Sequence, residues 1–107
     1  MGLIRELQER QKPWVIRNFG GRSRLYPVLG VAEEAGELSH HVLKMEQNIR
    51  GTKEEHLAGI RDSLADVIIF CLDVATAYEI DLEDALIEVF EEVMQRDWVK
   101  HREEAEK

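Results

Sequence analysis

The chain has 107 residues, of which 44% are hydrophobic and 34% are charged, with two prolines and a net charge of −8. A chain of this length forms one domain, its composition is typical of a folded, helix-rich protein rather than a disordered one, and its acidity makes DNA and RNA poor partners. The single cysteine excludes an intramolecular disulfide framework, and no secretory signal pattern opens the chain, so we expect a cytoplasmic protein.

Residues 1–26 form a basic leader helix and loop. They hold six basic and two acidic side chains, a charge of +4, which leaves −12 on the remaining residues. The spacing of apolar residues predicts a helix over residues 3–17, with a break or kink near Pro13 because proline removes a helical hydrogen bond. The Gly20-Gly21 pair predicts a loop over residues 18–24.

A helical core is predicted over residues 27–100. Pro27 suits a first helical turn and Gly51 suits an exit, so a second helix is expected over residues 27–48. Its apolar residues should face the core; they are Val28, Val31, Ala32, Ala35, Leu38 and Val42.

Two more helix starts are marked by capping patterns. Thr52 followed by Glu55 has the form of a capping box, and Asp81 followed by Asp84 predicts the cap of a fourth helix. Residues 101–107 are expected to be a frayed tail. No stretch alternates as a strand does, so the predicted fold class is all-α.

Several glutamates share one face of the predicted second helix. At about 100° per residue, Glu34 and Glu37 lie about one turn apart, and Lys44 continues the same stripe. Two carboxylates at this spacing can converge on one hard cation such as Mg²⁺. An ordinary solvated face explains the same pattern, and for this helix alone that alternative stays open.

The predicted third helix places carboxylates where they are least tolerated. Its most apolar stretch, residues 64–78, contains Asp66 and Asp73 and is shorter than the roughly 20 residues that span a bilayer, so no membrane partner is expected. Asp62, Asp66 and Asp73 project to one side. Because an unpaired buried carboxylate costs several kcal/mol or more, these groups need a metal, basic partners or a water-filled cleft. Partnered structural acids or an exposed strip are the alternative.

Together the two helices offer four carboxylates, Glu34 and Glu37 facing Asp62 and Asp66. Four carboxylates suffice for one or two Mg²⁺ ions that bridge a polyphosphate, and Mn²⁺ can substitute for Mg²⁺. The histidines and the single cysteine follow no zinc-binding spacing.

These residues resemble the MazG-like superfamily of all-α nucleoside triphosphate pyrophosphohydrolases, which includes dimeric dUTPases and phosphoribosyl-ATP pyrophosphohydrolases. The match runs from about Trp14 to Trp98 and consists of W-V-I-R-N-F-G, L-G-V-A-E-E-A-G-E-L, D-S-L-A-D-V-I-I-F-C-L-D-V-A, I-D-L-E-D-A-L and Q-R-D-W. The E-E-x-G-E-L element is quite specific in this order and spacing, and the other parts are supportive.

The resemblance implies a magnesium-dependent hydrolase acting on acid anhydrides. Such an enzyme cleaves a (deoxy)nucleoside triphosphate to the monophosphate and pyrophosphate, for housecleaning of the nucleotide pool. The resemblance also implies a bundle of four to five helices, of the MazG-like type, that is completed by oligomerisation as a homodimer or homotetramer. Glu34 and Glu37 match the first acidic pair of the family, and Asp66 matches the aspartate that ends its second motif.

One position departs from the family pattern. The second motif is usually glutamate, two residues, aspartate, but the position three before Asp66 is Ser63. Asp62 lies on nearly the same helical face, and we assign it the missing metal-ligand role. If that assignment is wrong, metal affinity is weaker, and the alternative is a catalytically weak or inactive helical module that binds metal or nucleotide. A phosphoribosyl-nucleotide pyrophosphohydrolase is a further alternative.

Several further residues are candidates for catalytic and substrate-binding roles. The proton acceptor is expected to be Glu33 or one of the ligand carboxylates, Glu34 and Glu37. Aromatics at amphipathic spacing are more often core residues, but Trp14 can stack on a base while Asn18 reads its edge. The cations that can hold phosphate oxygens are Lys44, Arg96 and Lys100, with Arg22 or Arg24 in the leader loop.

Overall fold

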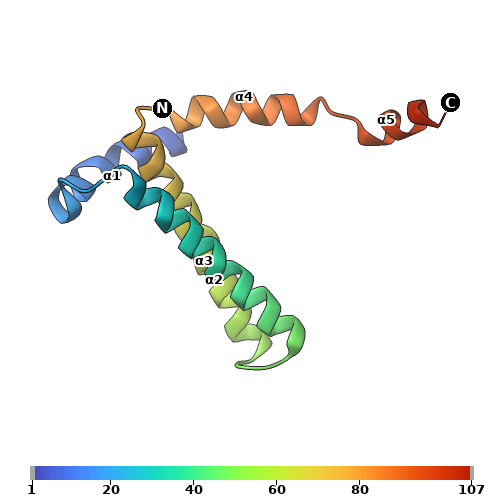
Figure 1. Ribbon diagram of the computed structural model, residues 1–107, viewed down its shortest axis with the longest axis horizontal. Coiled ribbons are helices and arrows are strands. Elements are labelled where there is room, and N and C mark those ends of the chain that lie inside the picture. Colours follow the sequence, from blue (N-terminus) through green and yellow to red (C-terminus); the bar gives the residue numbers. More distant parts are fainter. Residues whose placement is uncertain (1, 107) are drawn as a thin grey trace.

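The computed structural model describes residues 2–106, and within them the chain is entirely helical (Figure 1). Residues 2–106 contain no strand, which confirms the predicted fold class. No helix among these residues is long and apolar enough to cross a membrane. The helices are α1 (Leu3–Phe19), α2 (Leu25–Gln47), α3 (Lys53–Ala77), α4 (Leu82–Met94) and α5 (Trp98–Ala105).

Helices α2 and α3 form an antiparallel hairpin, and local capping explains its tip. α2 ends at Gln47, which agrees with the expected end at residue 48, and its cap residue Asn48 adopts the left-handed conformation (φ 57°). The Thr52 hydroxyl accepts a hydrogen bond from the Glu55 N–H at 3.1 Å, so the predicted cap of α3 is confirmed. The two helices therefore reverse direction within a few residues.

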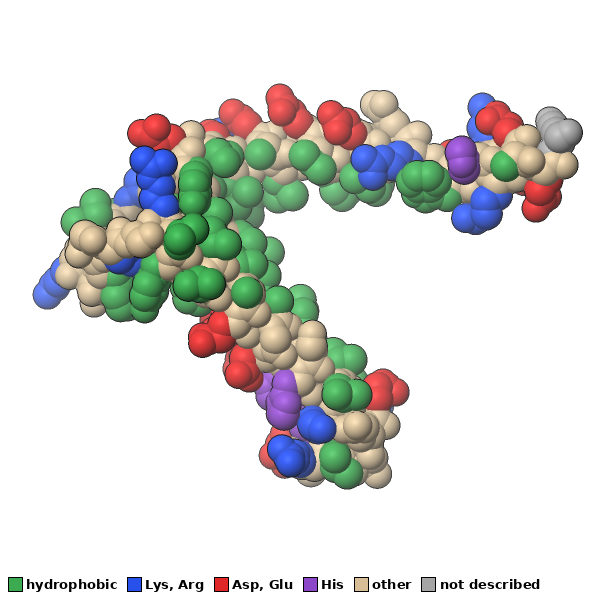
Figure 2. Space-filling model, in the orientation of Figure 1, with side chains coloured by type: hydrophobic (Ala, Val, Ile, Leu, Met, Phe, Trp, Pro, Cys, Tyr) green, Lys and Arg blue, Asp and Glu red, His purple; other side chains and the backbone are tan. Residues whose placement is uncertain are grey.

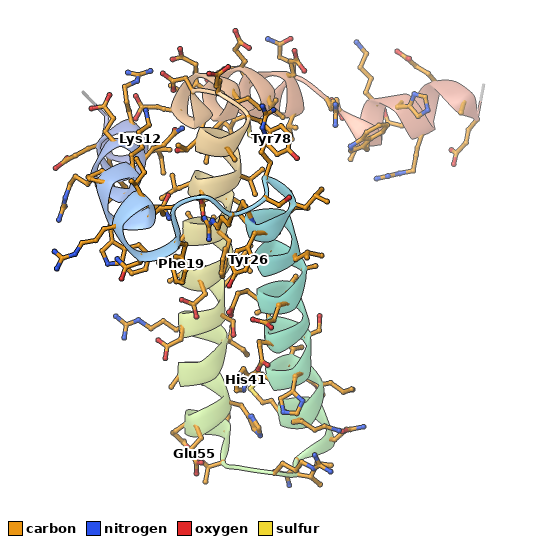
Figure 3. The ribbon with its side chains drawn as sticks, turned by 60° about the vertical axis from the view of Figure 1, so that its left-hand side comes forward. Lys12, Phe19, Tyr26, His41, Glu55 and Tyr78 are labelled. Carbon is orange, nitrogen blue, oxygen red and sulfur yellow. The ribbon has the colours of Figure 1, made fainter. Side chains whose placement is uncertain are left out.

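Two glycines receive aromatic rings across the hairpin and so fix its register. The ring of Phe70 on α3 lies on Gly30 of α2, and the ring of His41 on α2 lies on Gly59 of α3. A methyl group at either glycine would overlap the facing ring. Figure 3 shows His41 between the two helices. Because each ring fits only over a residue without a side chain, the helices are held at one alignment.

Helix α1 packs against α3 and continues through Pro13, so a break there is wrong, while the alternative of a kink stays a prediction. It is held on both sides of the proline. Before it, the Gln11 amide donates to the Ile69 carbonyl at 3.0 Å; after it, Arg22 pairs with Asp73. This packing offsets the hydrogen bond that proline removes.

A short elbow joins α3 to α4 and is closed by α1. Glu79 takes a left-handed conformation (φ 57°), and the buried Gln8 side chain donates to the Ile80 carbonyl (2.8 Å) and accepts from the Leu82 N–H (3.1 Å). Arg5 pairs with three acids at the start of α4. Its hydrogen bond to Asp81, and then the Asp84 N–H, lower the pKa of Asp81. The predicted cap of α4 by Asp81 is confirmed (3.1 Å).

Helices α4 and α5 form an arm that projects away from the hairpin (Figure 1). Asp97 caps α5 by accepting the Lys100 N–H at 2.9 Å, so a helix occupies residues 101 to 105, where a frayed tail was expected. Lys107 lies outside the described residues. The arm and the hairpin together give the single chain the shape of the letter L.

One chain does not close a bundle. Its radius of gyration is 18.0 Å, against about 13 Å for a compact domain of about 100 residues. Among residues 2–106 the fully buried apolar side chains are few, with Pro27, Leu72 and Ala75 at the junction of α1, α2 and α3. Val28 and Val42, expected in the core, are 41% and 39% exposed. The apolar face of α2 therefore lies on the surface of the single chain.

Candidate active site

Glu34 of α2 and Asp66 of α3 approach each other across the hairpin. Glu34 is half-buried. This burial, and after it the negative charges of Asp66, Glu33 and Glu37, raise the pKa of Glu34; a hydrogen bond from its protonated form to Asp66 acts in the same direction. Asp66 is exposed to solvent, and a cation between the two carboxylates would relieve their repulsion. The predicted opposition of the two helices' acids is thus present for this pair.

The other predicted acids surround the pair less closely. Glu33, Glu37 and Asp62 are exposed. Glu33 and Glu37 lie near enough for their charges to act on Glu34. Within residues 2–106, no group of three or more histidine, cysteine, aspartate or glutamate side chains gathers tightly enough to hold a metal ion. The single chain therefore presents one close carboxylate pair with further acids at its edge.

Ser63 is one of the few polar residues of α3 that are buried. It is only 4% exposed, whereas its neighbour Asp62 faces solvent. The position at which the MazG-like pattern has a glutamate is therefore filled by a small buried side chain. The assignment of Asp62 as a replacement ligand stays a prediction.

Asp73, the third aspartate on this side of α3, is neutralised within the chain. Arg22 pairs with it, and the side chains are 15% and 9% exposed, respectively. The Arg22 guanidinium also lies over the rings of Phe19 (5.3 Å) and Tyr26 (4.7 Å). Asp73 is thus a partnered structural acid, and Arg22 holds the leader loop instead of standing free for a phosphate. The sequence offered Arg22 only as a phosphate-binding candidate.

The remaining predicted cations lie apart from the carboxylate pair. The Lys44 ammonium donates to the Gln47 side chain at 2.9 Å. Arg96 follows the end of α4 and Lys100 lies in α5, both on the projecting arm (Figure 1). The single chain therefore does not bring Arg96 or Lys100 to the acids, and the substrate roles of all three residues stay predictions.

An aromatic cluster borders the leader loop. Trp14 is 58% exposed and meets the ring of Phe19 edge-on at 5.8 Å, and Phe19 stacks on Tyr26 at 6.1 Å, as Figure 3 shows for these two rings. The Asn18 side-chain amide donates to the Trp14 carbonyl at 2.8 Å. Trp14 is thus exposed in the single chain, and the Asn18 amide binds a carbonyl of the last turns of α1, which ends at the cap residue Gly20.

A histidine pair lies farther along the hairpin. The rings of His41 and His56 are 5.9 Å apart, and His56 is buried with Nε2 3.0 Å from the Ile49 carbonyl oxygen. Nδ1 of His41 is buried without a partner. The contact between His41 and Gly59 explains this burial, since the ring fills the notch that fixes the hairpin register.

Comparison of the chain with protein-family models, with curated proteins and with solved structures found no match.

Proposed function

We propose that this chain is a magnesium-dependent nucleoside triphosphate pyrophosphohydrolase that releases a nucleoside monophosphate and pyrophosphate. The observation that carries the proposal is the approach of Glu34 and Asp66 from two helices, because these residues stand at the matching positions of the MazG-like acidic motifs. The E-E-x-G-E-L element supports the same function. The proposal includes a cytoplasmic homodimer or homotetramer.

The chemistry suits this residue set. Hydrolysis between the α and β phosphates needs a water to attack phosphorus while pyrophosphate leaves, and such reactions depend on positioning and charge neutralisation. Glu34 and Asp66 would hold Mg²⁺, with Glu37 and Asp62 at the edge of the site. Mg²⁺ held there would neutralise the charge of the polyphosphate and would activate the attacking water. A nearby carboxylate, Glu33 or one of the ligand carboxylates Glu34 and Glu37, would accept the proton of the attacking water.

The decisive measurement is pyrophosphate release from a panel of ribo- and deoxyribonucleoside triphosphates, including modified bases, with Mg²⁺ or with EDTA. Asp66→Asn and Glu34→Gln would each remove a direct ligand of the ion and should lower the rate by about 100-fold or more, because losing even an outer partner of a metal ligand costs roughly 10–100-fold. Glu54→Gln removes an exposed carboxylate at the far end of α3 and should leave the rate unchanged. Release that persists in EDTA or in both site variants would contradict the proposal.

A second candidate is a metal- or nucleotide-binding module without turnover. The burial of Ser63 and the absence of a three-carboxylate cluster among residues 2–106 favour it. It predicts that titration calorimetry detects Mg²⁺-dependent nucleotide binding that Asp66→Asn abolishes, while no triphosphate in the panel is hydrolysed.

A further inference from the structure

Two histidines from opposite helices meet inside the hairpin. His41 lies on α2 and His56 on α3, and their ring centres are 5.9 Å apart with the ring planes inclined by 57°. Figure 3 shows His41 between the two helices, and Figure 2 shows histidine side chains on the hairpin limb beside acidic ones. The two residues follow no zinc-binding spacing in the sequence, so it is the fold that brings their rings together.

The proton of the buried His56 ring has a defined position. Only 4% of this residue is exposed, and Nε2 lies 3.0 Å from the carbonyl oxygen of Ile49. Because a carbonyl oxygen can only accept a hydrogen bond, the proton lies on Nε2, and Nδ1 keeps its lone pair. Metal-binding histidines usually have this arrangement, in which one ring nitrogen donates to a backbone carbonyl and the other binds the ion.

His41 has a nitrogen that the rest of the chain does not satisfy. Nδ1 is buried and has no hydrogen-bond partner among residues 2–106. The nitrogen-bearing edge of the ring lies on Gly59, which follows His56 by about one turn of α3. Buried polar atoms are normally paired, and an unpaired one costs free energy. A metal ion bound through this nitrogen would supply the missing partner.

The separation of the two rings suits a shared metal ion. Zinc lies about 2.0–2.1 Å from an imidazole nitrogen, so the ion is roughly 3.2 Å from the ring centre. Two rings on one ion then have centres about 5.2 Å apart at the tetrahedral angle and about 6.4 Å apart when they are opposite each other. The observed 5.9 Å between His41 and His56 lies within this range.

A hollow of about 240 Å³ lies beside His56 near the tip of the hairpin. Met45, which borders it, follows His41 by four residues and so lies on the same face of α2. Its thioether is a soft ligand, which suits transition metals better than Mg²⁺. Glu46 and Lys53 carry opposite charges at the hollow, so it does not repel a cation. The lining consists of Met45, Glu46, Asn48, Gly51, Lys53 and His56.

We propose that His41 and His56 bind one divalent transition-metal ion of the zinc class across the hairpin. Imidazole nitrogen suits zinc, nickel and copper, whereas Mg²⁺ prefers oxygen ligands. No third histidine, cysteine, aspartate or glutamate of residues 2–106 is close enough to complete the set, so water or the Met45 thioether takes the remaining positions. The ion joins α2 to α3 and fastens the hairpin at one register.

This site is separate from the carboxylate pair. His56 precedes Asp66 by ten residues, which is about 15 Å along α3. His41 follows Glu34 by seven residues, about 10 Å along α2. The inference therefore goes beyond the proposed activity, and it can be tested without any nucleotide.

The first test is titration calorimetry with Zn²⁺ in excess Mg²⁺, which occupies oxygen sites. The wild-type chain should bind one Zn²⁺. His41→Gln and His56→Gln should each weaken binding by about 10-fold or more, since losing even an outer partner of a metal ligand costs roughly that much. Glutamine at position 56 can still donate to the Ile49 carbonyl, and circular dichroism should show unchanged helicity.

His40→Gln is the matched control. The His40 ring is exposed and lies 5.6 Å from that of His41, but it belongs to the same helix and cannot join α2 to α3. This variant and Asp66→Asn should bind Zn²⁺ as the wild type does. A loss in His40→Gln equal to that in His56→Gln would place the ion on the surface of α2, and a loss in Asp66→Asn would place it on the carboxylates. Either result overturns the proposal.

The second test uses the unaltered chain, so it does not depend on the folding of any variant. Among the four histidines, Zn²⁺ should shift the nuclear magnetic resonance signals of the His41 and His56 ring nitrogens and leave those of His101 in place. The melting temperature should rise with Zn²⁺, because an ion that binds only the folded state stabilises it. Unchanged signals of His41 and His56 at saturating Zn²⁺ would overturn the proposal.

Discussion

Arg22 pairs with Asp73, and this contact fastens the loop after α1 to the C-terminal part of α3. The pair joins residues 51 positions apart, and the Arg22 guanidinium is covered by the rings of Phe19 and Tyr26. The shielding makes this a structural ion pair whose loss leaves a poorly solvated charge.

We predict that Arg22→Ala destabilises the fold by about 3 kcal/mol, because removing one partner of a buried pair leaves the other uncompensated. Urea unfolding followed by circular dichroism measures the change. Arg24→Ala removes a neighbouring exposed guanidinium that lies over Tyr78, and should cost no more than about 1 kcal/mol. Equal losses in the two variants would show that Asp73 does not depend on Arg22.

Glu34→Gln should raise the melting temperature at neutral pH in EDTA. The raised pKa of Glu34 means that its ionised form is disfavoured in the folded state, and glutamine mimics the neutral form. The gain should be complete above that raised pKa and should shrink as pH falls toward the ordinary value of 4.5, where wild-type Glu34 binds its proton. Melting curves at several pH values measure it. A gain in melting temperature that stays constant down to acidic pH would show that it does not come from the ionisation of Glu34.

Mg²⁺ should stabilise the wild-type chain if Glu34 and Asp66 hold it. An ion that binds only the folded state raises its stability by about 2.7 kcal/mol at one hundred times the dissociation constant. Differential scanning fluorimetry with increasing Mg²⁺ should therefore show a rising melting temperature in the wild type and in Glu54→Gln, and a flat one in Asp66→Asn. An equal rise in all three would place the bound ion elsewhere.

The glycines of α2 offer a matched pair of substitutions. Gly30→Ala forces a methyl group into the ring of Phe70 and should cost about 1–3 kcal/mol, the usual range for overpacking. Gly36→Ala meets no atom within 4 Å and should stabilise the chain by roughly 0.5–1 kcal/mol through helix propensity. Chemical denaturation measures the free energy of unfolding, which should fall in Gly30→Ala and rise in Gly36→Ala. Loss of stability in Gly36→Ala would indicate that a partner or ligand approaches that face closely.

Local chemistry made the helix starts predictable. Thr52 and Asp81 cap the helices that they were expected to cap, because the cap depends on a side chain and an N–H three residues away. The continuation of α1 through Pro13 was not predictable, because contacts with α3 that local sequence does not reveal offset the cost of the proline. For the same reason the Arg22–Asp73 pair was not predicted.

The carboxylate site was partly predictable. Helical spacing placed Glu34 and Asp66 on facing sides, but their contact depends on the hairpin register, which Gly30 and Gly59 set through rings from the opposite helix. The apolar residues of α2 were expected to face the helical core. Val28, Val31, Ala32 and Ala35 line an open apolar hollow between α2, α3 and the start of α4, because periodicity identifies an apolar face but does not identify what covers it.

The elbow between α3 and α4 sets the direction of the whole arm. α4 has 13 residues and extends about 20 Å. A rotation of about 10° about Ile80 would therefore move the far end of α4 by roughly 3 Å, a displacement comparable to the size of a small aliphatic side chain. Gln8 and Arg5, which belong to the first helix, sit at that elbow. Two side chains from the first eight residues thus determine where Phe90 and Val93 stand, more than eighty positions later in the chain.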